Sequence, residues 1–385
     1  MARDRFFPIL QFLHFEDDTP PSRDDPDYDR LWNIGKIFDI LSNKFCEMYS
    51  ATEHLAVDEV IVLYKGRAIF RQYIPKKRKR FGIKIYKLCD SLGYTYDMSV
   101  YLGKQRRHAT AEITATHKTV LQVIRRVEGL GHKVFMDNYF TSPALFDDLF
   151  QCKINAFGTF RHDRRGMSWD IGPKSLKMKG GDIVTRVRGN LRAVRSKDRR
   201  DVYILTNMHS PPVEGNFTDD SGNAIKPRVV EDYNAYMGFV DKSDRMVNSY
   251  GIARRTWKWT MKLFFHLTDM TILNAFIIHK SSGGKMAHKS FREVLVRDLI
   301  LSHEENVTAS GVSRGRPSPF PSQLSRLEVK HSQHWPSKGK QRRCRVCSLK
   351  KQTRSTLYFC NKCDVGLCIV SCFEKWHKTC EPVSR

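Results

Sequence analysis

Acidic residues, cysteines outside the C-terminal region and long apolar runs are all scarce in this sequence of 385 residues. Asp and Glu total 41 against 66 Lys and Arg, which gives a formal net charge of +25. A chain with so little negative charge needs an anionic partner, and nucleic acid is the first candidate. Seven of the ten cysteines lie between Cys344 and Cys380, and in a reducing compartment such clustering favours metal ligands over disulfides.

The sequence also offers little that would hold it in a membrane. Its longest apolar stretch, residues 259–280, is interrupted by Lys262, His266 and Asp269, which favours a buried core helix over a membrane span. The first residues are charged and lack the hydrophobic segment of a secretory signal, and there is neither a lipidation motif nor a basic amphipathic helix. We therefore expect a soluble intracellular protein with no membrane partner.

What the sequence has is a hydrophobic content of 41%, enough to bury a sizeable core. The hydrophobic period predicts helices within residues 1–50 and then changes to that of strands. We expect strands at 55–58, 81–88 and 94–101, a helix at 118–129, a strand at 133–137, a helix at 143–151 and a strand at 154–160. This order is that of an α/β, RNase H-like fold, whose chemistry depends on acids at the ends of its first and fourth strands. Asp58 and Asp137 occupy those two places.

Four aspartates are candidate metal ligands: Asp58, Asp137, Asp241 and Asp244. Cleavage of DNA strands needs two divalent ions held by a few carboxylates that are distant in sequence and close in space. Mg²⁺ prefers such oxygen ligands, and residues three apart on a helix share a face, as Asp241 and Asp244 would. An aspartate at a strand end is also an ordinary turn or cap residue, so both interpretations stay open on the residues alone.

Two basic segments are candidate nucleic-acid contacts. The run Lys76, Lys77, Arg78, Lys79 and Arg80 lies between two expected strands, where it would bind phosphate, act as a nuclear import signal, or form a solvated hairpin tip. The second segment, residues 254–259, combines Arg254 and Arg255 with Trp257 and Trp259. Indoles stack on unpaired bases and Arg pairs with phosphate, although both tryptophans are equally compatible with a helix core.

The C-terminal cysteines have the spacing of zinc ligands. Two CxxC pairs lie within about twenty residues of each other, and further ligand types follow, which suffices for two tetrahedral Zn²⁺ ions. The eight predicted ligands are Cys344, Cys347, Cys360, Cys363, Cys368, Cys372, His377 and Cys380. So short a segment cannot build an adequate core without metal, and we expect a cross-braced arrangement. The spacing leaves the pairing open, and His331 or His334 could replace one member.

Several longer segments resemble the piggyBac transposase family, which includes the piggyBac transposable element-derived proteins. The resemblance covers essentially the whole chain in the family's order, and the matching segments are residues 57–59, 64–67, 72–75, 91–104, 136–142, 233–234 and 237–244. It implies a catalytic triad of Asp58, Asp137 and Asp241, with Asp244 as an accessory acid, and two Mg²⁺ or Mn²⁺ ions.

The resemblance also implies an activity and partners. Family members carry out cut-and-paste transposition by two-metal phosphoryl transfer: strand cleavage, hairpin formation at the transposon ends, and strand transfer into TTAA targets. Trp259 matches a tryptophan that stacks on a distorted base during hairpin formation, and the zinc module is used to bind DNA near the transposon end. We accordingly expect a nuclear protein, a homodimer, that binds double-stranded DNA.

The sequence departs from the family pattern at four places. Family members usually have a longer N-terminal region, the usual double glycine is Gly238–Phe239, a frequent glutamine is Arg245, and a conserved tetrapeptide reads Lys258–Met261. None removes a carboxylate, yet they keep two alternatives open. One is a domesticated or truncated, catalytically inactive DNA-binding protein, and the other is a zinc-based protein-interaction module on an inert scaffold.

These observations predict six segments. We expect a remnant of a helical dimerisation and DNA-binding region at 1–52, the first part of the RNase H-like core at 53–160 and a mostly β insertion at 161–230. The second part of the core with further helices follows at 231–302, then a flexible linker at 303–340 and the zinc-binding domain at 341–385.

Overall fold

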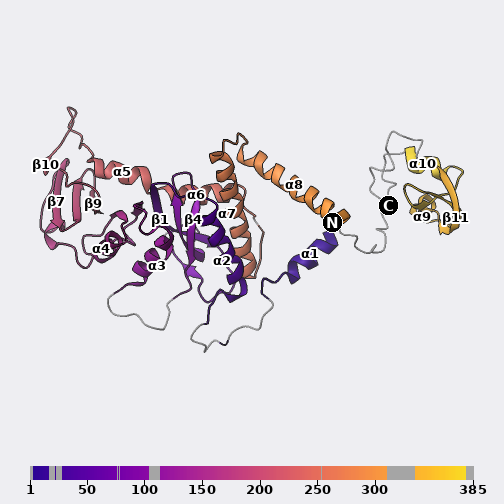
Figure 1. Ribbon diagram of the computed structural model, residues 1–385, viewed down its shortest axis with the longest axis horizontal. Helices are drawn as coiled ribbons and strands as arrows, with labels where there is room; N and C mark the ends of the chain where they lie inside the picture. Colours follow the sequence, from indigo (N-terminus) through magenta and orange to yellow (C-terminus); the bar gives the residue numbers. More distant parts are fainter. Residues whose placement is uncertain are drawn as a thin grey trace. The chain divides into compact units, whose positions relative to one another are not determined.

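The computed structural model describes residues 3–16, 22, 28–75, 77, 79–103, 113–252, 254–309 and 334–378 (Figure 1). The chain divides into two compact units, residues 1–297 and 298–385. Each unit has its own hydrophobic core, and the two are described separately below.

A single mixed sheet of ten strands organises the first unit. Its order is β10-β7-β8-β9-β6-β5-β1-β3-β2, with β4 paired to β3. The strands are β1 (His54–Leu63), β2 (Gln72–Tyr73), β3 (Phe81–Asp90), β4 (Thr95–Val100), β5 (Lys133–Met136), β6 (Asn155–Thr159), β7 (Asp182–Arg188), β8 (Leu191–Lys197), β9 (Asp201–Thr206) and β10 (Gly215–Asn216). The predicted α/β fold with a mixed sheet is confirmed.

The central strand β1 pairs antiparallel with β3 and parallel with β5, and β5 continues parallel to β6. The sequence analysis expected the first strand to end at Asp58, and that expectation is wrong. The strand continues to Leu63 because residues as far as Leu63 hydrogen-bond in register with β3, where Leu63 pairs with Gly82. Asp58 therefore lies in the middle of β1, at the level where the shorter β5 ends.

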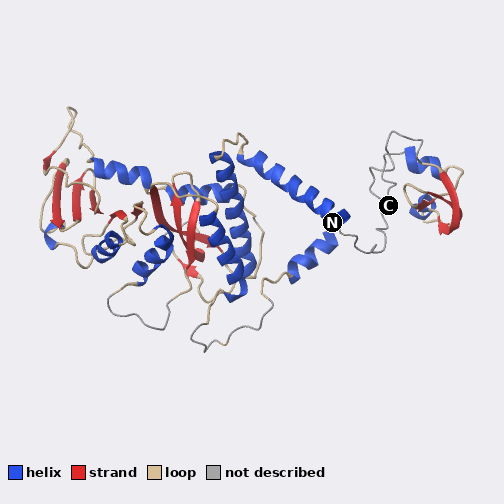
Figure 2. Ribbon diagram, viewed as in Figure 1, coloured by secondary structure: helices blue, strands red, loops and turns tan. Residues whose placement is uncertain are grey.

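Helices cover both sides of this sheet (Figures 1 and 2). On one side lie α3 (Ala115–Ile124), extended by a 3₁₀ turn at Arg125–Val127, and α4 (Pro143–Gln151). On the other, α2 (Trp32–Glu47) and α7 (Trp259–Ser281) run side by side. Every residue of β4 is buried, as expected for a strand covered on both faces.

Local capping explains where two of the helices begin. The hydroxyl of Ser142 accepts a hydrogen bond from the N–H of Leu145, and Pro143 occupies the first turn of α4, as the sequence predicted. The hydroxyl of Thr114 accepts from the N–H of His117 at the start of α3. Helix α7 is long and apolar enough to cross a membrane, but 61% of that stretch is buried inside the protein, so it is a core helix.

The predicted β insertion extends the main sheet. Strands β7 to β10 join the core through β9, which pairs antiparallel with β6. The guanidinium of the buried Arg195 on β8 donates to the carbonyls of Ile171, Gly172 and Leu176 and to the carboxylate of Asp201. The loop that contains the 3₁₀ turn Trp169–Ile171 is thereby fixed to the insertion strands.

After the insertion the chain becomes helical again. Helices α5 (Arg228–Tyr236) and α6 (Phe239–Ser249) are separated at Met237 and Gly238, and α6 packs on β1, β3 and α7. Helix α8 covers His288–Ala309 and α1 covers Arg3–Phe12. Because α8 continues to Ala309, the structure differs from the flexible linker predicted to begin at residue 303. Residues 310–333 of that linker lie outside the described residues.

The second unit contains a three-stranded sheet in the order β11-β12-β13. Its elements are β11 (Pro336–Arg343), α9 (Arg345–Leu349), β12 (Ser355–Cys360), β13 (Val365–Gly366) and α10 (Cys372–Lys378). Five cysteines form most of its small core, together with Val346, Leu367 and Trp376. The folded module thus begins by residue 334, a few residues before the predicted boundary at 341.

Candidate metal centres and nucleic-acid interface

Two of the predicted metal ligands lie next to each other in the sheet. Val57 of β1 pairs in parallel register with Met136 of β5, so the residues that follow them, Asp58 and Asp137, emerge side by side on one face. Their backbone surroundings fix both carboxylates. The N–H of Glu59 donates to Asp58 Oδ1 at 2.7 Å, and the N–H of Tyr139 donates to Asp137 Oδ1 at 2.9 Å.

Helix α6 brings in the other two aspartates. Asp241 and Asp244 lie on α6, which packs on β1 and β3, and the buried Ser243 between them contacts the Thr95 hydroxyl at 3.3 Å. Asp241 is exposed, whereas Asp244 is half-buried and its Oδ1 is buried. That oxygen has no hydrogen-bond partner among the described residues. We call Asp58, Asp137, Asp241 and Asp244 the carboxylate site.

Burial and repulsion from neighbouring carboxylates disfavour the ionised forms of Asp58 and Asp137. Burial, and then the negative charges of Glu59 and Asp137, raise the pKa of Asp58 to about 7. Burial also raises the pKa of Asp137, and Glu59 adds to that shift. Buried carboxylates that repel one another hold a cation readily, because the cation removes the cost of ionising them. Hard oxygen donors of this kind fit Mg²⁺ or Mn²⁺.

One lysine of the predicted basic run lies among these acids. Lys77 Nζ is 3.1 Å from Glu59 Oε1, and its charge lowers the pKa of both Asp58 and Asp137. Asp241 in turn favours the charged form of Lys77, which places that side chain between the strands and α6. Among the described residues, the carboxylates do not gather three oxygens within 4.8 Å of one another.

The other predicted DNA contacts lie in different places. Lys79 Nζ is 3.5 Å from Asp244 Oδ2, so it borders the carboxylate site as well. The guanidinium of Arg254 lies over the rings of Phe6 and Phe7 in α1, at 5.9 and 5.2 Å. Arg80 and Arg255 are both exposed. Lys76 and Arg78 lie outside the described residues.

Trp259 contacts a core residue and also lines a cavity. It packs edge-on against Phe70, with ring centroids 5.0 Å apart, and it also lines a cavity of about 790 Å³. The walls of that cavity include three arginines and three further aromatic residues: Arg30, Arg67, Arg71, Tyr28, Trp32 and Phe70. This combination suits a base between aromatic faces and its phosphates beside guanidinium groups. The three arginines were not among the predicted DNA contacts, although Arg67 lies in one of the motifs that carry the family resemblance.

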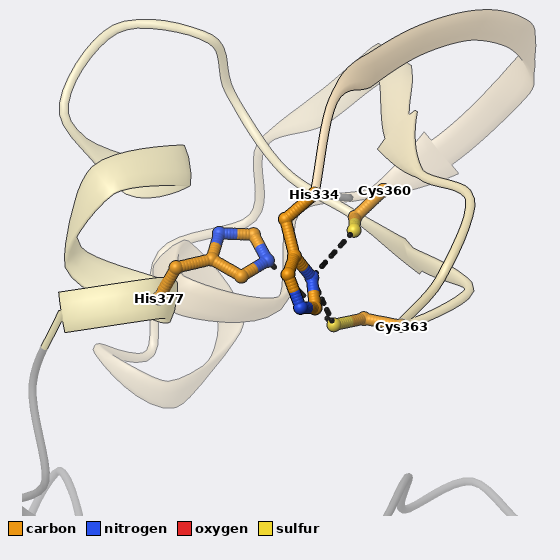
Figure 3. Close-up of side chains that lie close together, drawn as sticks. All are labelled: His334, Cys360, Cys363 and His377. Atoms are coloured by element: carbon orange, nitrogen blue, oxygen red, sulfur yellow. Dashed lines mark hydrogen bonds between the residues drawn. The ribbon is translucent and has the colours of Figure 1, made fainter. Parts of the chain in front are cut away.

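The C-terminal ligands form two sets of four. Each set has four donor atoms within 4.8 Å of one another: Cys344, Cys347, Cys368 and Cys372 in the first, and His334, Cys360, Cys363 and His377 in the second (Figure 3). The sets alternate along the chain, which is the expected cross-braced pattern. His334 completes the second set, one of the replacements the sequence left open, whereas Cys380 and His331 lie outside the described residues.

The geometry of both sets suits Zn²⁺. In the second set, His334 Nδ1 is 3.5 Å from Cys360 Sγ and 3.4 Å from Cys363 Sγ, and His377 Nε2 is 3.6 Å from Cys363 Sγ (Figure 3). His377 Nδ1 lies 2.7 Å from the carbonyl of Phe373, an orientation that leaves Nε2 for a metal ion. In the first set, Cys347 Sγ and Cys372 Sγ are 3.7 Å apart.

The thiol of Cys344 ionises more readily than an ordinary cysteine thiol. Burial opposes ionisation, but hydrogen bonds from the backbone of Cys347 and Cys368 outweigh it and lower the pKa of Cys344 to about 7. The thiolate is the form that binds metal.

Two family models together match most of the chain. Residues 1–276 match a family model described as Transposase IS4, and residues 326–378 match one described as a DDE_Tnp_1-like zinc finger. The chain therefore belongs to the piggyBac-type transposase family.

Individual relatives belong to the same family. The chain is 27% identical to human piggyBac transposable element-derived protein 3, a match that covers 98% of this chain and 63% of that protein. It is 22% identical to human piggyBac transposable element-derived protein 5, over 78% of this chain and 60% of that protein. The chain thus spans less than two thirds of the length of either.

A solved structure matches along nearly the whole chain. It is a cryo-EM structure of a piggyBac transposase synaptic complex with hairpin DNA, with a TM-score of 0.69 and 25% identity. The match covers 97% of this chain and 80% of that one. The predicted fold, family and zinc module are confirmed.

Proposed function

We propose that the chain is a metal-dependent DNA transposase, in which Asp58, Asp137 and Asp241 hold two Mg²⁺ or Mn²⁺ ions and Asp244 assists. The adjacency of Asp58 and Asp137 on neighbouring parallel strands is the observation that carries the proposal. Bound ions of this kind activate the attacking oxygen and stabilise the leaving oxygen in phosphoryl transfer.

The chain's own residues position the DNA. The hydrogen bonds from Glu59 and Tyr139 hold the carboxylates of Asp58 and Asp137 in fixed orientations. Lys79 and Arg80, with Arg254 and Arg255, provide the positive charge that attracts the phosphate backbone. The cavity beside Trp259 accepts an unpaired base, which suits a hairpin end. The substrates are transposon ends and TTAA targets, and two copies of the chain act together.

The zinc module contributes a second DNA contact. Its strand β11 carries the exposed cations Lys338, Lys340, Arg342 and Arg343. Two Zn²⁺ ions, one in each set of Cys and His ligands, hold this strand in place.

A DNA-binding derivative without catalysis is the second candidate. Lys77 lies among the carboxylates, where it competes with a bound ion, and this observation favours such a protein. The matched human proteins are themselves named as derived from transposable elements.

A cleavage assay separates the two. Purified chain with Mg²⁺ receives a DNA hairpin that ends in TTAA, and the Asp137→Ala variant serves as control. Hairpin opening by the wild type alone supports the transposase. Tight, salt-sensitive binding with no opening by either protein supports the non-catalytic derivative.

A further inference from the structure

A pair of hydroxyl groups lies beside the carboxylate site. Gly158 of β6 pairs in parallel register with Met136 of β5. The residues that follow them, Thr159 and Asp137, therefore lie next to each other, on strands about 4.8 Å apart. Asp58 is the next side chain in the same row. Thr159 thus extends the row of predicted metal ligands by one polar side chain.

Helix α5 supplies the second hydroxyl. The phenolic oxygen of Tyr233 lies 3.2 Å from Oγ1 of Thr159. The ring of Tyr233 also packs against Phe157 of β6, with ring centroids 6.0 Å apart, so both ends of the side chain are fixed. Among the described residues, neither Asp58 nor Asp137 hydrogen-bonds this phenol. Because Thr159 can donate to the phenolic oxygen, the proton of Tyr233 is available to a third group.

The surroundings of Tyr233 keep this proton on the phenol. Burial raises the pKa of Tyr233, and the negative charges of Asp137 and Asp58 add to the shift, although the hydrogen bond with Thr159 opposes it. A neutral phenol donates a hydrogen bond, whereas an ionised carboxylate only accepts. Tyr233 therefore gives the carboxylate site a donor that its four aspartates cannot provide when they hold cations.

We propose that Tyr233 is a catalytic residue of the carboxylate site, whose hydroxyl donates a hydrogen bond to a non-bridging oxygen of the phosphate that is cleaved. The inference rests on the proposed function, since it concerns the same reaction. Negative charge spreads over the non-bridging oxygens during phosphoryl transfer. A fixed neutral donor stabilises part of that charge and keeps its own proton throughout. Thr159 is a positioning residue, because it acts through Tyr233.

The test measures the single-turnover rate at which the full chain with Mg²⁺ opens the hairpin that ends in TTAA. Tyr233→Phe removes only the hydroxyl and is expected to slow opening by about ten- to hundredfold. Its dissociation constant for the hairpin, measured with Ca²⁺ in place of Mg²⁺, should stay within about twofold of the wild-type value. Tyr236→Phe is the matched control. Tyr236 lies one turn further along α5, where its ring stacks on His54 at 4.1 Å, and the rate should not change.

A sulfur substitution in the DNA separates a contact with the phosphate from a purely structural role. One phosphorothioate diastereomer of the scissile phosphate replaces the oxygen that accepts from Tyr233, and sulfur is a weak acceptor. With that diastereomer, wild type and Tyr233→Phe should differ by no more than about twofold, whereas the full difference should remain with the other. A weaker contact of sulfur with Mg²⁺ affects both proteins and cancels in their ratio. Thr159→Val should show the same pattern with a smaller loss.

Equal rates for wild type and Tyr233→Phe would overturn the inference, and so would a loss of the same size with both diastereomers. If Tyr233→Phe does not fold, Thr159→Val replaces it. A loss confined to one diastereomer would then support the inference, and equal rates would overturn it. Opening that Asp137→Ala abolishes, with no effect of Tyr233→Phe, would remove only the role of Tyr233. No opening by the wild type would overturn both proposals.

Discussion

Asp58 and Asp137 lie side by side on one face of the central sheet, each one step beyond the paired Val57 and Met136. Two neighbouring carboxylates that are largely buried cannot both ionise without a cation nearby. Lys77 supplies part of this positive charge, since its Nζ lies 3.1 Å from Glu59 Oε1. Its charge lowers the pKa of both Asp58 and Asp137.

The stability of the first unit should depend on the protonation of Asp58. Folding raises the pKa of this residue to about 7, so the folded protein keeps a proton that the unfolded chain loses near pH 4. Its contribution is favourable below the unfolded pKa and is lost as pH rises through about 7. We predict that the free energy of unfolding in metal-free buffer falls over this range, as measured by urea denaturation.

The Asp58→Asn variant should lose this part of the pH dependence. The exposed Asp163 provides the control, since Asp163→Asn removes a carboxylate that is not buried. Identical pH profiles for wild type and Asp58→Asn would contradict the raised pKa.

The contact between α7 and β4 should depend on Asn274. Its side-chain oxygen accepts from the N–H of Thr95 at 3.0 Å, and its amide donates to the Thr95 carbonyl at 2.9 Å. We predict that Asn274→Leu lowers the free energy of unfolding by about 2–4 kcal/mol, because two buried backbone groups lose their partners. Chemical denaturation tests this, with the exposed Gln151→Leu as a neutral control. A loss no larger than that of the control would rule out the structural role.

The second unit should unfold when zinc is removed. A strong chelator is expected to release two Zn²⁺ per chain, measured with a colorimetric indicator, and to make β11–β13 susceptible to protease. Cys344→Ser should release one ion, whereas Cys152→Ser, outside both sets, should release none. Retention of the protease-resistant module after full chelation would contradict this account.

Trp259 should contribute more than Trp257 to the binding of an unpaired base. We predict that Trp259→Ala weakens binding of a hairpin with an unpaired base by about 1–3 kcal/mol, because a stacking face is lost. Trp257 is 85% exposed and does not line the cavity, so Trp257→Ala should have a much smaller effect. Fluorescence of a base analogue at the unpaired position reports stacking. Equal losses in both variants would refute a specific subsite.

Local signals in the sequence predicted most elements of the first unit. Ser142 and Pro143 marked the start of α4, and the acids at positions 58 and 137 indicated neighbouring strands. The true end of β1 was missed, although the β-branched Val60, Ile61 and Val62 favour a strand that continues past Asp58, as its pairing with β3 shows. The continuation of the sheet into the insertion depends likewise on the long-range pairing of β6 with β9.

The surroundings of charged side chains were harder to predict from the sequence than the fold. A run of five basic residues predicts a solvated surface, and Lys77 is exposed as expected, yet it also pairs with Glu59 beside buried carboxylates. In the zinc module, the spacing of the two CxxC pairs identified them as ligands. The choice of His334 required the fold, because His334 lies ten residues before Cys344 and the strand β11 separates the two residues.

The most direct test of the carboxylate site is a crystal structure of the chain soaked with Mn²⁺, with anomalous data that locate the ion. The account predicts an anomalous peak in contact with the carboxylates of both Asp58 and Asp137, with Lys77 displaced from Glu59. A structure in which Mn²⁺ avoids these two residues, while Lys77 keeps its place among them, would contradict it.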